Sequence, residues 1–585
     1  MHRKWTVSAI FCAITASCQP LCGFDCAQIR QLTDHYLGLH YSITTFDDNL
    51  SNRTLERFIQ ALDPSKLYFL RSDIQNFTET YACALDNMIQ NEDCSGLNAI
   101  LLTYSQRYRT QQDNIKALID AEHDFSLDEY YESDPKKRTY ASDATDLQER
   151  WRKRIKLELL QLTERSNTID KARKQLKEHY MQNANHLSKL NGTELASIFL
   201  SAFASSLDPH SKYFSPEEFE DFHSSTGGSR VSGFTCRIRI QPSSFGSPVA
   251  KTIGIIHLPS FYSDFAGSQH SSDPPESTKK DLKQLIQRLK TDGESLDGLI
   301  IDLRSNAGGS LEEAIKIIGL FIQSGPVVQI RSIKGTTQIL KNNDSTQLYA
   351  GPLTLLMNRQ SASSSEILAG AIKDYRRGII VGGSHSFGKG TVQTIENINQ
   401  GQLGAIKVTI HQFFLPSGYS TQLKGVASDI ILPDLNDTLA MGEEFYENPL
   451  PWSCIEPLTV DSTDLVTPYL EALRAASRGR VSTNEHFQKI ISKVNAYHQT
   501  AAHRSLISLR STETTSNSGD HPNSPHTENS LQSDNQQVSG TNAFENSSET
   551  ITKLVNDPEL FETLAITADY IQLLNDKPPG TIALP

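Results

Sequence analysis

Residues 299–310 of the chain read LIIDLRSNAGGS, and this stretch decides the fold class. Its apolar start predicts a strand that is buried on both faces. Gly308 and Gly309 then allow a tight turn in which the backbone can approach a ligand closely. Ser310 and Glu313 have the spacing of a capping box, so we expect a helix to begin there. Free N–H groups at such a helix start suit an oxyanion hole, and a plain βα connection is the alternative.

The alternation of short apolar runs with helical periodicity continues through residues 253–435, which predicts an α/β core built from βα units. Helical periodicity also fills residues 26–205, where Leu195, Ile198 and Phe199 have the i, i+3, i+4 spacing of an amphipathic helix. It returns toward the C-terminus. We therefore expect an α/β core with oxyanion-hole turns, flanked by mainly helical N- and C-terminal domains.

A second strand, turn and helix pattern covers residues 353–372, with the turn sequence RQSASSSE. A serine at such a turn is exposed beside backbone N–H groups, as a nucleophile must be, and Ser363 occupies that place. Ser363 and Glu366 also have capping-box spacing, so a simple helix cap is the alternative for Ser363.

A third pattern, GIIVGGSHSFGKGTVQ at residues 378–393, carries Lys389 between two glycines. A phosphate-binding loop needs Ser or Thr directly after the lysine to hold Mg²⁺, and Gly390 stands there instead. A lysine can serve as a general base when desolvation lowers its pKa toward neutrality. No Asp or Glu stands beside Lys389 in the sequence to hold the proton on the amine.

Together the three segments resemble the carboxyl-terminal processing, or tail-specific, proteases, a family of Ser–Lys serine peptidases. The family pattern Asp-Leu-Arg-x-Asn-x-Gly-Gly stands here as Asp302 to Gly309, Ser-Ala-Ser-x-Ser-Glu as Ser361 to Glu366, and Phe-Gly-Lys-Gly-x-x-Gln as Phe387 to Gln393.

By motif position, the resemblance implies that Ser363 is the nucleophile, Lys389 the general base and Gln393 the residue that orients the lysine. It also implies backbone donors of an oxyanion hole and two supporting side chains: Gly308 or Gly309 with Ser364, and Glu366 with Ser386. The implied reaction is hydrolysis of peptide bonds through an acyl-enzyme, without a cofactor or metal.

The likeness extends to the segment Asp208 to Pro216, which matches the family's pre-catalytic motif, and to the helix-rich C-terminal part. Two departures stand out. The separation of Ser363 and Lys389 is one residue longer than the family usually shows. The chain between Pro216 and Thr252 is too short for the PDZ domain that the family carries there.

The composition limits the partners. The chain of 585 residues has a net charge of −13, which argues against nucleic acid or an anionic membrane surface as the main partner. No CxxC or HExxH pattern appears, so no metal is expected. The expected partners are protein or peptide substrates, in particular unstructured or C-terminal segments.

The N-terminus resembles a secretory signal, because His2, Arg3 and Lys4 precede a short apolar stretch and small residues. We therefore expect an exported, periplasmic protein of a bacterial cell envelope. A lipid anchor at Cys18 is the less favoured alternative. In an exported chain Cys83 and Cys94 are the best disulfide pair, and two free thiols are the alternative.

These patterns give the following expected organisation: a signal peptide at 1–23, a helical domain at 24–223, a linker in place of the PDZ domain at 224–251, the protease core at 252–440, and a helical C-terminal domain at 441–585 that contains a disordered stretch at 511–548. Two other classes of protein stay open. One is an inactive peptide-binding protein on the same fold, and the other is an acyl-CoA enzyme with a similar oxyanion hole, which the export signal disfavours.

Deletion of residues 511–548 should leave the fold and the peptidase activity unchanged, because a Ser-, Thr-, Asn- and Gln-rich stretch cannot bury a core. The measurement is the melting temperature together with the peptidase rate of the deletion variant. A large drop in melting temperature would show that the segment is packed against the rest of the protein.

Overall fold

The computed structural model describes residues 25–166, 168–187, 192–224, 231–239, 250–263, 277–291, 295–343, 347–461, 464–500, 505–510 and 557–576. The expected signal peptide and the stretch 511–548 lie outside these residues. The chain divides into two compact units. The helical unit contains Met1–His35, Phe46–Leu127 and Asp134–Phe203, and the core unit contains Tyr36–Thr45, Asp128–Ser133 and Ala204–Pro585.

The helical unit is built from amphipathic helices. These are α1 (Cys26–Leu39), α2 (Asp48–Leu62), α3 (Arg71–Tyr81), α4 (Leu85–Gln90), α5 (Ser95–Asp120), α6 (Ala144–Ser166), α7 (Ile169–Leu187) and α8 (Gly192–Leu207), of which α1 and α8 continue into the core unit. In α6, Leu147, Trp151, Ile155 and Leu159 repeat every four residues and are all buried, so one face of the helix packs against α5 and α7. The helical domain expected before the core is thus present.

A disulfide joins Cys26 at the start of α1 to Cys94 just before α5, with a Cα–Cα distance of 5.9 Å. The expected pair of Cys83 and Cys94 is therefore wrong, and Cys83 is an exposed free thiol. Closeness in sequence misled the prediction, because a disulfide forms where two Cβ atoms approach in space. Here the approach is between two helix ends whose cysteines are 68 residues apart.

The core unit is organised around a six-stranded sheet of order β12-β9-β8-β5-β4-β3. Its strands are β3 (Ser232–Arg239), β4 (Ala250–His257), β5 (Gly298–Asp302), β8 (Leu353–Met357), β9 (Ile379–Gly382) and β12 (Ile430–Ile431). The pairs from β4 to β12 are parallel, and only β3 runs antiparallel to its neighbour β4. The edge strand β3 falls within residues 224–251, where we expect a linker in place of a PDZ domain.

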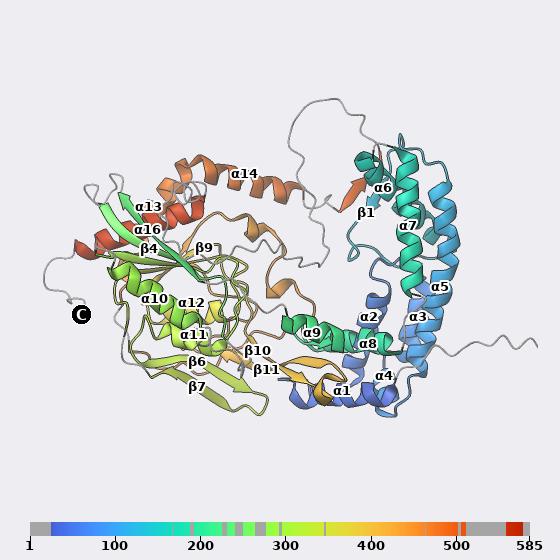
Figure 1. Cartoon of the computed structure of the whole chain (residues 1–585), viewed down its shortest axis with the longest axis horizontal. Coiled ribbons are helices and arrows are strands. Elements are labelled where there is room, and N and C mark those ends of the chain that lie inside the picture. The colour runs from blue at the N-terminus through green and yellow to red at the C-terminus, as the bar shows by residue number, and fades with distance from the viewer. Residues whose placement is uncertain are drawn as a thin grey trace, which may run out of the picture. The chain divides into compact units, whose positions relative to one another are not determined.

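Helices cover both faces of the six-stranded sheet (Figure 1). The helices α10 (Thr278–Thr291), α11 (Leu311–Ile318) and α12 (Ser364–Asp374) lie on one face, and α13 (Leu470–Thr483), α14 (Glu485–Thr500) and α16 (Pro558–Asn575) lie on the other. In β5, Leu299 and Ile301 face the first cluster of helices, whereas Ile300 faces the second. The expected α/β core is confirmed as a three-layer arrangement.

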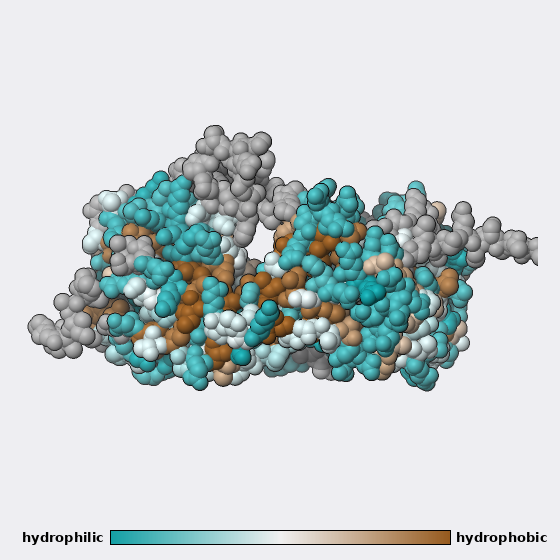
Figure 2. Space-filling view, turned by 90° about the horizontal axis from the view of Figure 1, so that it is seen from below, coloured by the Kyte–Doolittle hydropathy of each residue, from teal (hydrophilic) through white to brown (hydrophobic). Residues whose placement is uncertain are grey.

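A second sheet of order β10-β11-β6-β7 lies on the far side of α11 and α12, and β2 (Lys212–Phe214) also pairs with β11. Its other strands are β6 (Gly325–Ser332), β7 (Thr337–Asn342), β10 (Thr391–Asn397) and β11 (Ala405–Phe414). Val328 and Phe413 pack into the same hydrophobic cluster as α11 and α12. The strands β7 and β10 carry the exposed apolar residues Ile339 and Ile395. Apolar surface, drawn in brown, is present on the face of the molecule that Figure 2 shows.

Shorter elements complete the core unit. They are α9 (Pro216–Ser224), the pair β1 (Tyr130–Glu132) and β13 (Leu506–Ser508), and the 3-10 helices η1 (Asn399–Gly401), η2 (Leu435–Thr438), η3 (Glu443–Phe445) and η4 (Thr467–Tyr469). None of the helices in the described ranges is long and apolar enough to cross a membrane.

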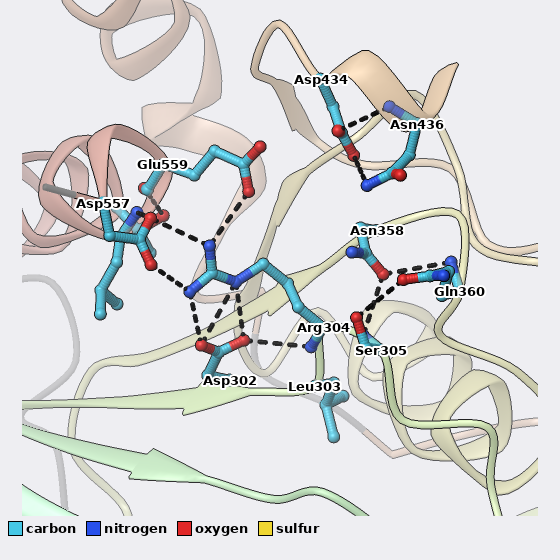
Figure 3. Close-up of polar contacts among 12 residues, drawn as sticks. Asp302, Leu303, Arg304, Ser305, Asn358, Gln360, Asp434, Asn436, Asp557 and Glu559 are labelled. Atoms are coloured by element: carbon cyan, nitrogen blue, oxygen red, sulfur yellow. Dashed lines mark hydrogen bonds and ion pairs between the residues drawn. The ribbon is translucent and has the colours of Figure 1, made fainter. Parts of the chain in front are cut away.

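The last helix is fixed to the sheet by a charged cluster around Arg304, which follows β5 (Figure 3). Its guanidinium donates to Asp302 at 2.7 Å, to Asp557 at 2.6 Å and to Glu559 at 3.1 Å. Further along α16, Leu564 and Ile571 are buried against the six-stranded sheet. A helix from the far end of the chain therefore closes one face of the central sheet.

Loss of the disulfide should destabilise the helical unit by roughly 2–4 kcal/mol, because the unfolded chain then gains the freedom of a long open loop. The change is Cys26→Ser, and the matched control is Cys83→Ser, which should have little effect. Thermal unfolding of the two variants measures the difference.

Alkylation without reductant should label Cys83 and Cys454, which are exposed and free, and should label Cys26 and Cys94 only after reduction. Labelling of Cys94 in the unreduced protein, or recovery of a peptide that joins Cys83 to Cys94, would contradict this pairing.

Candidate active site

Three turns meet at one edge of the six-stranded sheet. They follow the C-terminal ends of β5, β8 and β9, which are parallel neighbours in the sheet. In open α/β sheets this edge is where ligands bind. A cavity of about 710 Å³ lies there. Its lining includes Gly309, Ser363, Ser364 and Lys389 from the three turns, and Gln393 from β10, which follows the third turn.

Ser363 directly precedes α12 and has a strained backbone, with φ of 56° and ψ of −113°. A positive φ in a residue other than glycine costs on the order of 1–3 kcal/mol and persists only where the surroundings impose it. The side chain of Ser363 is partly exposed in the cavity. Ser364 is only 1% exposed, and its hydroxyl donates to the carbonyl of Gly309 at 3.0 Å. The exposed hydroxyl is thus that of Ser363.

The two glycines predicted for the oxyanion hole differ in what their N–H groups do. The N–H of Gly308 donates to Oδ1 of Asn306 at 2.8 Å, so it is already used. Within the described part of the chain, no acceptor contacts the N–H of Gly309 or of Ser364. The two turns touch, because a Cβ added to Gly308 would lie 2.7 Å from Cβ of Ser363. The geometry therefore favours Gly309 over Gly308 as a free donor.

Gly309 also has to be glycine. Its φ is 139°, and an added Cβ would lie 2.3 Å from the carbonyl oxygen of Phe261. The neighbouring backbone is bonded tightly there, since the N–H of Ser310 donates to the same oxygen at 2.7 Å. Any side chain at position 309 would therefore clash with Phe261, and Gly309 itself lines the cavity.

Lys389 lies in the third turn, and its Nζ donates to the carbonyl of Thr391 at 2.9 Å. Burial, followed by the positive charge of Lys407, lowers the pKa of Lys389 to about 8. Three carboxylates, those of Glu443, Glu366 and Asp208, act in the opposite direction. A lysine with this pKa is half deprotonated near pH 8, as a general base requires. The sequence indicated the desolvation, but the charged neighbours come from distant segments.

Glu366 joins the turn of Ser363 to the turn of Lys389. Its carboxylate is completely buried and accepts four hydrogen bonds, from the N–H of Ser363 (2.7 Å), Gly388 (2.7 Å) and Lys389 (2.9 Å) and from the hydroxyl of Ser386 (2.6 Å). Burial raises the pKa of Glu366 to about 7, and these donors oppose that shift. Ser363 therefore stands at the start of α12 with its N–H held, which fits the capping-box spacing and leaves its hydroxyl in the cavity.

Gln393 lies near the lysine but does not contact it directly. Its Nε2 donates to the hydroxyls of Thr391 (2.9 Å) and Thr409 (3.0 Å), and among the described residues no hydrogen bond joins Gln393 to Lys389. Thr409 donates in turn to Asp208, at 2.9 Å. No local sequence pattern marks Thr391 or Thr409, which are ordinary strand residues in β10 and β11.

The described ranges contain no group of three or more His, Cys, Asp or Glu side chains that could hold a metal ion.

Family models match most of the chain. The N-terminal domain of tail-specific proteases matches residues 33–217, peptidase family S41 matches residues 252–432, and the C-terminal domain of tail-specific proteases matches residues 436–572. The three matches follow the order of the helical unit, the protease core and the C-terminal helices. They confirm the resemblance that the three motifs carry.

Curated relatives carry names that agree with the family models. A tail-specific protease of Haemophilus influenzae is 28% identical over 73% of this chain and 72% of that protein. A carboxy-terminal-processing protease of Bartonella bacilliformis is 40% identical over 27% of this chain and 36% of that protein. Among solved structures, the photosystem II D1 C-terminal processing protease is 29% identical, with 35% of this chain and 48% of that chain aligned at a TM-score of 0.29.

Three successive family models and a relative that matches along most of its length lead to one conclusion: the chain belongs to the tail-specific proteases of peptidase family S41, which are serine peptidases.

Proposed function

We propose that this protein is an exported endopeptidase in which Ser363 and Lys389 form a catalytic dyad. The observation that supports this most is the carboxylate of Glu366, which accepts hydrogen bonds from the N–H groups of both residues and so holds the two turns together. Both side chains line the same cavity as Gly309 and Ser364.

The proposed reaction begins with neutral Lys389, which accepts the hydroxyl proton of Ser363 as the oxygen attacks the scissile carbonyl carbon. The N–H groups of Gly309 and Ser364 stabilise the oxyanion that forms, and loss of one such donor typically costs on the order of 10²–10³-fold in rate. The lysine then gives its proton to the leaving amine. Water, deprotonated by the same lysine, releases the second product from the acyl-enzyme and restores the Ser363 hydroxyl.

The proposed substrates are unstructured or C-terminal segments of exported proteins, and the proposed location is the periplasm. The names of the relatives, tail-specific and carboxy-terminal-processing proteases, support this choice. The described residues between Pro216 and Thr252 form α9 and β3, which supports the proposal that this chain lacks a tail-binding PDZ domain. Selection would then depend on the cavity, whose apolar lining includes Leu311, Ile367 and Phe413.

Ser363→Ala should reduce the peptidase rate on the order of 10⁶-fold and leave the fold intact, because only the nucleophile is lost. Ser364→Ala is the matched control. It removes one hydrogen bond to Gly309, worth roughly 1 kcal/mol of stability, but keeps the backbone N–H, so substantial activity should remain. Degradation of an unfolded reporter protein measures both. An inactive Ser364→Ala beside an active Ser363→Ala would place the nucleophile one residue later.

The peptidase rate should rise with pH through about 8, because the deprotonated lysine is the active form and burial lowers the pKa of Lys389 to about 8. Lys389→Arg should be inactive at every pH, since arginine does not lose its proton in this range. The matched control is Lys373→Arg on α12, where the side chain pairs with Asp429 at the surface and should tolerate the change. A rate that is flat between pH 6 and 10, or an active Lys389→Arg, would exclude the lysine as general base.

A further inference from the structure

Behind Lys389 lies a buried carboxylate, Asp208, which the proposed reaction does not use. The side chain of Asp208 has no exposed surface, and hydrogen-bond donors surround its carboxylate. Nε2 of His40 lies 3.1 Å from it, the hydroxyls of Ser211 and Thr409 donate at 2.5 Å and 2.9 Å, and the N–H of His210 donates at 2.8 Å. A buried carboxylate with this many donors is ionised: burial, the largest effect, raises the pKa of Asp208, and the bonds from His40, Ser211 and the N–H of His210 act against burial and lower it.

His40 is fixed in one tautomer by its own neighbours. Its Nδ1 lies 2.9 Å from the N–H of Ile43 and 3.3 Å from that of Ser42, and a ring nitrogen that accepts these bonds carries no hydrogen. The hydrogen of a neutral ring is therefore on Nε2, and it points at Asp208. His40 is also completely buried and lies in the segment Tyr36–Thr45, which belongs to the core unit.

The charge of Asp208 sets the direction of the hydrogen bonds that lead to the lysine. An ionised carboxylate can only accept, so the hydroxyl of Thr409 donates to it and accepts from Gln393. The amide of Gln393 must then present its nitrogen to Thr409 and to the hydroxyl of Thr391. Its oxygen is left on the opposite side of the amide, away from the two threonines.

We propose that Asp208 and His40 are positioning residues of the catalytic lysine. Acting through Thr409, they fix the orientation of the Gln393 amide and the place of Thr391, whose carbonyl accepts from Nζ of Lys389. The oxygen of Gln393 is thereby kept as the second acceptor for the lysine during turnover. This inference rests on the proposed role of Lys389 as general base. It adds His40 to the site, although His40 lies more than 300 residues before Lys389 in the sequence.

Thr409→Val tests the link, because valine keeps the shape and removes the hydroxyl. The expected result is a fall in kcat on the order of 10–100-fold with little change in KM, since misplacement of a catalytic group costs that much. Thr409→Ser keeps the hydroxyl and should recover most of the rate. Thr354→Val is the matched control: Thr354 is equally buried, its hydroxyl accepts one bond from Thr567, and it lies outside the cavity. A normal kcat in Thr409→Val would overturn the inference.

Two substitutions of His40 separate positioning from a local structural role. In His40→Gln the side-chain amide nitrogen can donate to Asp208 from the place of Nε2, but the acceptor for the N–H of Ile43 is lost. In His40→Asn the side-chain oxygen can still accept from Ile43 near the place of Nδ1, but the shorter side chain cannot reach Asp208. Positioning predicts that His40→Gln keeps a kcat at least about tenfold above that of His40→Asn. The reverse order, with His40→Asn the more active, would show that the turn of residues 40–43 is what matters and would overturn the inference.

The failure of this inference is distinguishable from the failure of the proposed function. Lys389→Ala is measured beside these variants on the full-length protein. If Lys389→Ala keeps a normal rate, the dyad itself is wrong. If Lys389→Ala is inactive while Thr409→Val and both His40 variants turn over normally, the dyad stands and the positioning role of Asp208 and His40 is refuted.

Discussion

The active site depends on one buried carboxylate. Glu366 lies within α12, yet its oxygens accept from the start of that helix and from the glycine turn that carries Lys389. Removal of a carboxylate from water costs several kcal/mol unless its lone pairs are matched by donors, and here four donors match them. The carboxylate therefore stabilises the fold only when both turns are in place. This couples the position of the proposed nucleophile to that of the proposed base.

The six-stranded sheet makes this coupling possible. Parallel neighbours deliver the ends of β5, β8 and β9 to the same edge, so three short turns meet without long loops. The turns are then joined by backbone contacts, such as the carbonyl of Asn306 accepting from the N–H of Ala362 at 2.9 Å. A rigid edge of this kind can hold the strained backbone of Ser363 and the close approach of Gly309 to Phe261. Only Ser363 is strained, because glycine adopts the positive φ of Gly309 without a steric cost.

The sequence predicted what is encoded locally. Apolar runs followed by small residues gave the strands β5, β8 and β9 and the turns after them, because burial on both faces and tight turning leave a pattern within a dozen residues. No local sequence pattern marks the disulfide or the hydrogen bond from Gln393 to Thr409. They depend on segments that meet only in the folded chain, such as the start of α1 with the start of α5, or β10 with β11. For the same reason the role of α16 in covering the sheet was not predicted, although a helical C-terminal domain was expected.

Substitution of Glu366 by glutamine tests whether this carboxylate couples the two turns, because the shape is kept while one acceptor oxygen becomes a donor group. The measurement is the rate at which a fluorophosphonate modifies Ser363, followed by mass spectrometry at pH 9, with circular dichroism to confirm that the variant is folded. We expect a folded variant that is modified on the order of 100-fold more slowly than the unsubstituted protein, since the two turns lose their common acceptor. An equal rate of modification at Ser363 in both proteins would contradict it.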